Sequence, residues 1–194
     1  DSWAVNTLEN GNKYIALCDG SGTGEKASSY SDKTLKLLEE FLKTGFSKAS
    51  SVKLINSSFL NSQEHDSFST VDLGIVDLKN GDFEIVKKGA APTVRMRREG
   101  VVDVIKSKTL PMGVFGGEKG KIKKTILNEN DIIVMASDGI SDALNKEDWI
   151  IDALAAIKSD NPEYIAETIM KIAATSDEES DDKTVIVSKL KKIG

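Results

Sequence analysis

The stretch ALCDGSGTGEKA, Ala16–Ala27, joins an apolar run to a glycine-rich loop. Asp19 ends the run, and Gly20, Gly22 and Gly24 follow at alternate positions. Glycine lets a backbone turn sharply or approach a ligand closely. The loop is therefore compatible with a phosphate cradle, a calcium loop or a metal site, and the rest of the chain has to decide among them.

Three established loop motifs fit this sequence poorly. A calcium-binding EF-hand loop starting at Asp19 would need a bidentate Glu where Tyr30 stands, and no helix precedes it. A dinucleotide-binding loop could accept Ala27 as its third small residue, but the strand–helix–strand context with a parallel partner strand is missing. A P-loop over GGEKGKI fails because Phe115 and Ile122 occupy the positions that need Gly and Ser or Thr.

The pattern of the chain predicts antiparallel strands interrupted by two pairs of helices. A helical period runs over 25–43, and Ser47 can cap a second helix. Asn-Gly pairs at 10–11 and 80–81 predict hairpin turns between alternating runs. Two further helices are expected over 147–157 and 162–174, before a last strand over 184–190. This order indicates an α+β fold with helices on the outer faces of stacked sheets.

Length and composition narrow the class of protein. The 194 residues suit one domain, and the net charge of −5 argues against nucleic acid as the main partner. No apolar run approaches the roughly 18 residues of a membrane span. The single cysteine excludes an internal disulfide and suits a reducing, cytoplasmic setting. Because the chain begins at Asp1 without an initiator Met, we expect it to be a domain cut from a longer protein.

Three aspartates share a placement at strand ends. Asp19 and Asp138 each follow a buried strand and precede Gly, and Asp181 comes just before the last strand. Asp1, beside the start of the first strand, is a candidate fourth member. A carboxylate at the rim of a sheet is held by rigid backbone yet open to solvent, which suits a divalent cation. Oxygen ligands without a His or Cys cluster select Mg²⁺ or Mn²⁺ over zinc.

Nucleophilic chemistry has weak support in this sequence. Cys18 lies inside an apolar run and is expected in the core. His65, the only histidine, lies in a polar linker and is expected at the surface. A Ser-His-Asp triad is therefore improbable.

Five separated segments resemble one known family. DGSGTGEKAS, FSTVDLGIVDLKNGDFEIVKKGAAPT, LPMGV, DIIVMASDGISDA and DDKTVIV occur in the order and at the spacing of metal-dependent (PPM-type, protein phosphatase 2C-like) serine/threonine phosphatases. Within that family the chain is most similar to the C-terminal phosphatase domain of the stage II sporulation protein E branch. The resemblance covers almost the whole chain, so we expect 1–194 to be a single phosphatase domain.

The resemblance implies a four-layer α-β-β-α sandwich of two antiparallel sheets flanked by helix pairs, with two Mn²⁺ or Mg²⁺ ions. It implies that Asp19 bridges both ions and that Gly20 contributes its carbonyl. Asp138 and Asp181 match the ligands of one ion, and Asp1 matches the acidic residue near the first strand. These carboxylates would serve catalysis by activating a water that attacks phosphorus in line.

Two departures from the family pattern affect the expected mechanism. Ser21 stands where the family usually has Met and where eukaryotic relatives have a His that is a candidate general acid. The resemblance therefore leaves protonation of the leaving group to water or unassigned. Lys183 replaces a common Met in the last motif, which we expect to change little.

The function implied is hydrolysis of a phosphoprotein, with a phosphorylated anti-sigma-factor antagonist in sporulation control as substrate. Neither nucleic acid nor direct membrane contact is expected for this domain, and a homo-oligomer is compatible with the sequence. The resemblance places the domain at the cytoplasmic face, anchored to the membrane through segments absent here. The alternative is a catalytically weak or inactive regulatory module of the same fold; retention of Asp19, Asp138 and Asp181 argues against it.

Overall fold

The computed structural model describes residues 1–22, 24–61, 68–97, 100–115, 121–144, 148–175 and 181–191. The chain divides into two compact units. Unit 1 comprises Asp1–Leu78, Asp82–Ala90 and Ser107–Thr125, and unit 2 comprises Lys79–Gly81, Ala91–Lys106 and Ile126–Gly194. Each unit is an antiparallel sheet with its own helices, so each is described by itself.

The sheet of unit 1 is built mainly from two hairpins. Strands β1 (Ser2–Thr7) and β2 (Lys13–Cys18) form the first, and β3 (Val71–Val76) and β4 (Asp82–Lys88) form the second. The strand order is β1-β2-β3-β4-β7, with β7 spanning Lys121–Ile126. Gly11 and Gly81 take positive φ angles of 85° and 82° in the turns, as the Asn-Gly pairs predict.

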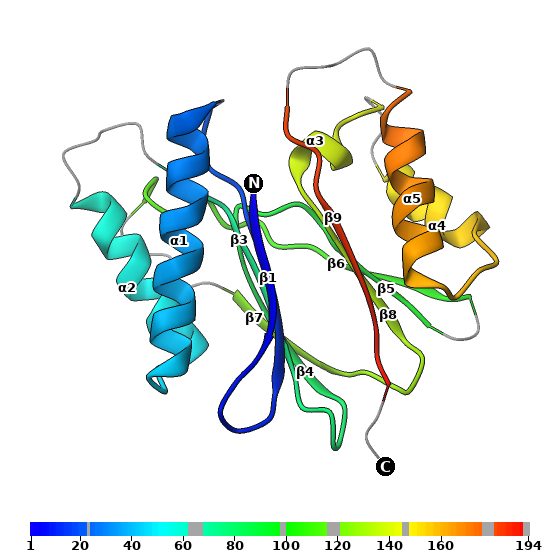
Figure 1. Ribbon diagram of the computed structural model, residues 1–194, viewed down its shortest axis with the longest axis horizontal. Coiled ribbons are helices and arrows are strands. Elements are labelled where there is room, and N and C mark those ends of the chain that lie inside the picture. The colour runs from blue at the N-terminus through cyan, green and yellow to red at the C-terminus, as the bar shows by residue number, and fades with distance from the viewer. Residues whose placement is uncertain are drawn as a thin grey trace. The chain divides into compact units, whose positions relative to one another are not determined.

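Two helices cover one face of this sheet. Helix α1 spans Glu25–Lys43, which is the predicted range, and α2 spans Lys48–Leu60. Ser47 caps α2 by accepting a hydrogen bond from the N–H of Ser50, as predicted. The two helices lie side by side (Figure 1). Their apolar residues pack with the strands in one core, whose fully buried members include Leu38, Ile55 and Leu73.

In the part of unit 2 that the structure describes there are a four-stranded sheet and three helices. The strand order is β6-β5-β8-β9. The strands are β5 (Thr93–Met96), β6 (Val102–Ile105), β8 (Ile132–Ala136) and β9 (Val185–Lys189). The helices are α3 (Asp138–Ser141), α4 (Trp149–Ala156) and α5 (Pro162–Ala173). The sequence does not predict α3, because four residues are too few to show a helical period. The N-cap of α5 is Asn161, with Pro162 in the first turn as expected.

The predicted fold class, α+β with two antiparallel sheets flanked by helix pairs, is confirmed. That 1–194 forms one domain stays a prediction. None of the helices in the described part of the chain is both long and apolar enough to span a bilayer.

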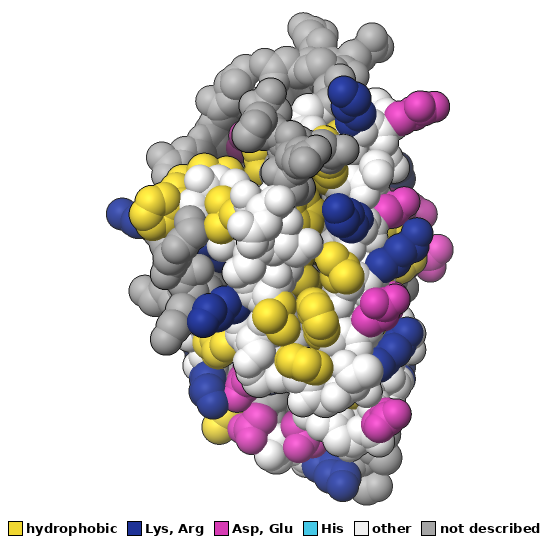
Figure 2. Space-filling view, turned by 90° about the vertical axis from the view of Figure 1, so that its left-hand side faces the viewer, with side chains coloured by type: hydrophobic (Ala, Val, Ile, Leu, Met, Phe, Trp, Pro, Cys, Tyr) yellow, Lys and Arg dark blue, Asp and Glu magenta, His cyan; other side chains and the backbone are white. Residues whose placement is uncertain are grey.

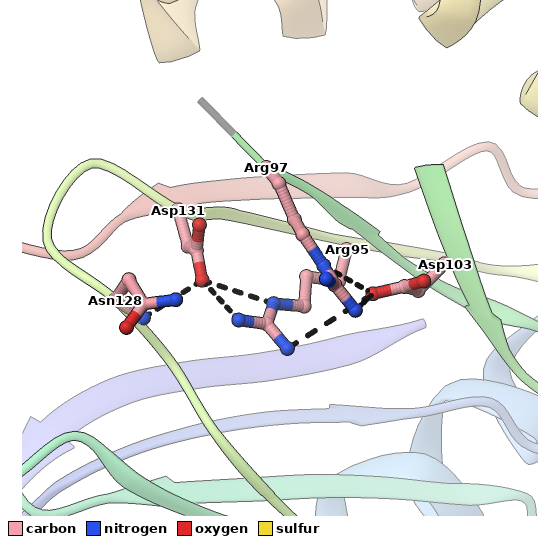
Figure 3. Close-up of polar contacts among 5 residues, drawn as sticks. All are labelled: Arg95, Arg97, Asp103, Asn128 and Asp131. Carbon is pink, nitrogen blue, oxygen red and sulfur yellow. Dashed lines mark hydrogen bonds and ion pairs between the residues drawn. The ribbon is translucent and has the colours of Figure 1, made fainter. Parts of the chain in front are cut away.

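A buried ion pair joins β5 to the turn before β8 in unit 2 (Figure 3). Arg95 of β5 donates from Nε to Asp131 Oδ2 at 2.9 Å and also from Nη2 to the same oxygen. The N–H of Asn128 donates to that oxygen at 2.8 Å, so the carboxylate also closes the turn before β8. Nearby, Asp103 accepts from Arg97 Nε at 2.8 Å, but this second pair is partly exposed.

We predict that Asp131→Ala destabilises the protein by about 3–5 kcal/mol, because it removes the close carboxylate partner of the buried Arg95 guanidinium and leaves the longer contact of Nη1 with Asp103, at 4.0 Å. The matched control is Asp103→Ala, which removes the partly exposed pair with Arg97 and the 4.0 Å contact with Arg95 but leaves Arg95 bonded to Asp131, and it should cost no more than about 1 kcal/mol. Urea unfolding followed by circular dichroism measures both. Equal losses in the two variants would contradict the assigned importance of burial.

Candidate metal centre

Backbone hydrogen bonds hold Asp19 at the end of β2. Its N–H donates to Thr70 Oγ1 at 3.1 Å, and its carbonyl accepts from the Thr70 N–H at 2.7 Å. Gly20 continues the pairing as an isolated bridge with Ser69. Asp19, the first predicted ligand, follows Cys18, the last residue of β2. Its backbone is nevertheless still hydrogen-bonded to the neighbouring segment.

Gly20 is required by packing. A Cβ atom built on it would lie 2.0 Å from the carbonyl oxygen of Ala27 and 3.1 Å from the nitrogen of Ser31. The first turns of α1 therefore pack directly on the backbone of the candidate ligand. Backbone conformation, and not space, favours glycine at the neighbouring positions 22 and 24. Gly22 and Gly24 have φ angles of +85° and +78°, and nothing lies within 4 Å of a Cβ built on either.

Asp1 lies at the same end of the sheet as Asp19. Ser2 pairs with Cys18 in the β1–β2 ladder, so the residues next to that pair are Asp1 and Asp19. Both carboxylate oxygens of Asp1 are buried. The hydroxyl of Ser2 is 2.9 Å from that of Ser31 on α1, which helps to fix the start of the strand.

Unit 2 brings the other two predicted ligands together. Asp138 begins α3, and its Oδ1 accepts from the N–H of Gly139 at 2.8 Å. Asp181 precedes β9, and its Oδ1 accepts from the N–H of Asp182 at 2.9 Å. Partial burial of Asp181 and the negative charge of Asp138 raise the pKa of the Asp181 carboxyl. A bound cation would offset that repulsion, so the two carboxylates suit a metal ion.

Two further residues hold this pair in place. Gly139 has no room for a side chain, because a Cβ would lie 2.3 Å from the carbonyl oxygen of Asp182. Ser137 donates from Oγ to the same carbonyl at 3.2 Å and accepts from the N–H of Thr184 at 3.0 Å. Ser137 is not among the site residues that the sequence predicts. Its signal is a polar residue at the end of a buried strand, directly before the ligand.

The donor chemistry fits Mg²⁺ or Mn²⁺. Asp1 and Asp19 are one carboxylate pair, in unit 1, and Asp138 and Asp181 are a second, in unit 2. Within the described ranges, no group of three or more His, Cys, Asp or Glu side chains is gathered closely enough to hold an ion. Each pair therefore supplies only part of a ligand set, and the assignment of these residues to metals is a proposal.

The nucleophile candidates give no competing site. Cys18 is fully buried, and burial raises the pKa of its thiol, as do the charges of Asp72 and Asp19. The thiol therefore stays protonated in the core, as the sequence predicts. His65 lies outside the described residues. Ser21 pairs with Phe68 through its backbone N–H, and its Oγ accepts from the Phe68 N–H at 3.2 Å.

We predict that Gly139→Ala displaces the 181–182 segment from Asp138. The variant should lose about 1–3 kcal/mol of stability, as overpacked sites do, and should also bind Mn²⁺ more weakly. Gly100→Ala is the control, since Gly100 has a φ of +77° but open space around its Cβ. It should cost about 1 kcal/mol of backbone strain and leave the metal affinity unchanged. Calorimetric titration with thermal melts separates the two, and parental Mn²⁺ affinity in Gly139→Ala would exclude the packing role.

Comparison with known proteins points to one family. The family model described as stage II sporulation protein E matches residues 9–191. The chain is 31% identical to stage II sporulation protein E of Priestia megaterium over 98% of its length, and 30% identical to that of Bacillus subtilis over the same share. It spans only 33% and 24% of these relatives.

A solved structure from Bacillus subtilis has the same fold. It contains the PP2C phosphatase domain and a fragment of the regulatory domain of the cell fate determinant SpoIIE. The match has a TM-score of 0.86 at 28% identity, and it covers 96% of this chain and 57% of that one. The resemblance predicted from the five motifs is thereby confirmed.

Proposed function

Because the chain belongs to the stage II sporulation protein E family and has the PP2C-type phosphatase fold, we propose that it is a metal-dependent protein-serine/threonine phosphatase. The observation that carries this proposal is the placement of two carboxylate pairs at strand ends, Asp1 with Asp19 and Asp138 with Asp181. Neighbouring carboxylates repel one another, so such a pair does not stabilise the fold by itself. It does suit a divalent cation, which binds oxygen ligands.

We assign Asp19, the Gly20 carbonyl, Asp1, Asp138 and Asp181 as ligands of two Mn²⁺ or Mg²⁺ ions. When bound, such ions would lower the pKa of a coordinated water and neutralise charge on a phosphoryl group. The chain itself contributes rigid placement. Asp19 is held by Thr70, and Asp138 and Asp181 are held by the close packing at Gly139.

Proton transfer is assigned to water rather than to a side chain. Ser21 occupies the position next to Gly20, and its hydroxyl already accepts a hydrogen bond from the Phe68 N–H. A hydroxyl is also a poor acid near neutral pH. The buried, protonated Cys18 thiol is likewise unsuited to attack phosphorus.

Membership of the family supports a proposal for the substrate. We propose a phosphorylated anti-sigma-factor antagonist, dephosphorylated at the cytoplasmic face by a protein whose other segments anchor it to the membrane. The chain spans a third or less of its curated relatives, so the partners and assembly of the whole protein belong to this proposal.

Removal of metal tests the reaction type. The chain stripped with EDTA should not hydrolyse p-nitrophenyl phosphate, and added Mn²⁺ or Mg²⁺ should restore turnover. Asp19→Asn should abolish turnover without loss of thermal stability, because it removes a ligand and also relieves repulsion among carboxylates. Asp82→Asn, at the opposite end of the sheet, makes the same charge change and should behave as the parent. Turnover in Asp19→Asn at saturating Mn²⁺ would overturn the ligand assignment.

Alkylation tests the competing thiol mechanism. Iodoacetamide should leave turnover unchanged under native conditions, because the Cys18 side chain is 0% exposed and its raised pKa keeps it protonated. Mass spectrometry should find the thiol modified only after unfolding in guanidinium. Inactivation that parallels native labelling of Cys18 would point to a cysteine nucleophile.

A further inference from the structure

A loop of unit 1 is bonded to the candidate ligand loop through one residue. Ser69 forms a bridge with Gly20 on one side and with Met112 on the other. The N–H of Met112 donates to the Ser69 carbonyl at 2.8 Å, and the Ser69 N–H donates back at 3.1 Å. Ser69 therefore connects residues 110–115 by backbone hydrogen bonds to the segment that contains Asp19 and Gly20.

The same loop is anchored from two other elements. Asn56 of α2 donates from Nδ2 to the carbonyl of Phe115 at 3.1 Å, and its Oδ1 accepts from the N–H of Gly113 at 3.0 Å. Asn56 itself is only 6% exposed. On the other side, Pro111 packs so closely on Gly89 that a Cβ there would lie 2.6 Å from the proline ring. The backbone of the loop is therefore both hydrogen-bonded to α2 and packed against Gly89.

Its apolar side chains nevertheless reach solvent. Val114 is 46% and Phe115 59% exposed, and Leu110 is 45% exposed. Phe68, the neighbour of Ser69, is 39% exposed. Figure 2 views the side of unit 1 on which α2 lies, and hydrophobic side chains are at the surface there. Phe68 precedes Ser69, and Val114 and Phe115 follow Met112, so the pairing of Ser69 with Met112 brings these exposed apolar residues to neighbouring segments. Exposed apolar groups that gather in this way are typical of an interaction site.

We propose that these four residues, Phe68, Leu110, Val114 and Phe115, form an apolar rim that docks the body of the phosphoprotein substrate. The inference rests on the proposed function and deepens it. A phosphate bound at ions that Asp19 and Gly20 would hold would bring the protein surface around the phosphoserine over the adjoining segments. The rim is joined to Gly20 through Ser69, so it is placed to meet that surface.

The chemistry of the rim indicates what it recognises. Its side chains are aliphatic and aromatic, so the partner surface next to the phosphoserine should carry exposed apolar residues. Phosphate contacts alone would not distinguish one phosphoprotein from another. Apolar anchors that are desolvated on docking supply such discrimination, because a few central side chains carry most of the binding energy at protein interfaces.

The test compares a small and a large substrate. The probes are p-nitrophenyl phosphate and the serine-phosphorylated anti-sigma-factor antagonist of the source organism. Val114→Ser/Phe115→Ser should lower kcat/KM on the phosphoprotein by about tenfold or more, mainly through KM, and change turnover of p-nitrophenyl phosphate far less. Phe68→Ser is a second variant with the same expectation.

Phe46→Ser is the matched control, since Phe46 is 45% exposed in unit 1 but lies just before the start of α2, at the opposite end of that helix from Asn56. It should leave turnover of both substrates unchanged.

Equal losses of turnover on both substrates in the rim variants would assign the rim to the structure of the site and overturn docking. Unchanged turnover of the phosphoprotein would also overturn it. A change in oligomeric state by light scattering would assign the rim to a second copy of the chain instead. If the parent hydrolyses neither probe with Mn²⁺, it is the proposed function that fails.

Discussion

Close backbone packing at two glycines is the constraint on which the candidate site depends. At Gly20 the first turn of α1 comes within 2.0 Å of where a Cβ would be, and at Gly139 the 182 carbonyl comes within 2.3 Å. In both places the glycine directly follows a candidate ligand, Asp19 or Asp138. Neither has a positive φ angle, so both are set by space and not by backbone conformation. Larger residues would move the segments that hold Asp19, Asp138 and Asp181.

The hydrogen bonds around these glycines give the site its rigidity. Thr70 accepts a hydrogen bond from the Asp19 N–H through its hydroxyl and donates one to the Asp19 carbonyl through its N–H. Ser137, at the end of β8, is hydrogen-bonded to the segment just before β9. Carboxylates that repel one another stay close only where packing and hydrogen bonds prevent the backbone from moving apart. The same network extends through Ser69 to the apolar rim, so recognition of a phosphate and recognition of the protein that carries it would share one framework.

Local signals in the sequence predicted most elements. The bounds of α1, the Ser47 cap and the Asn-Gly turns depend on residues within a few positions of each other, and all were found. Contacts between distant strands were not predicted. The alternation of β3 places Asp72 opposite its core residues, yet Asp72 is 1% exposed and pairs with Lys87 Nζ at 2.5 Å. No local pattern reveals that both faces of a strand are buried.

By itself the sequence determined the fold class, the family and the residues to be proposed as ligands, because order and spacing of motifs are properties of the chain. Only the tertiary structure decided which of them meet. It paired Asp1 with Asp19 through the β1–β2 register and Asp138 with Asp181 through Gly139 and Ser137, and it revealed Asn56 behind the exposed rim. The physical reason is range: turns and caps are encoded by neighbours, whereas close approach of segments some 40 residues apart depends on how the whole core packs.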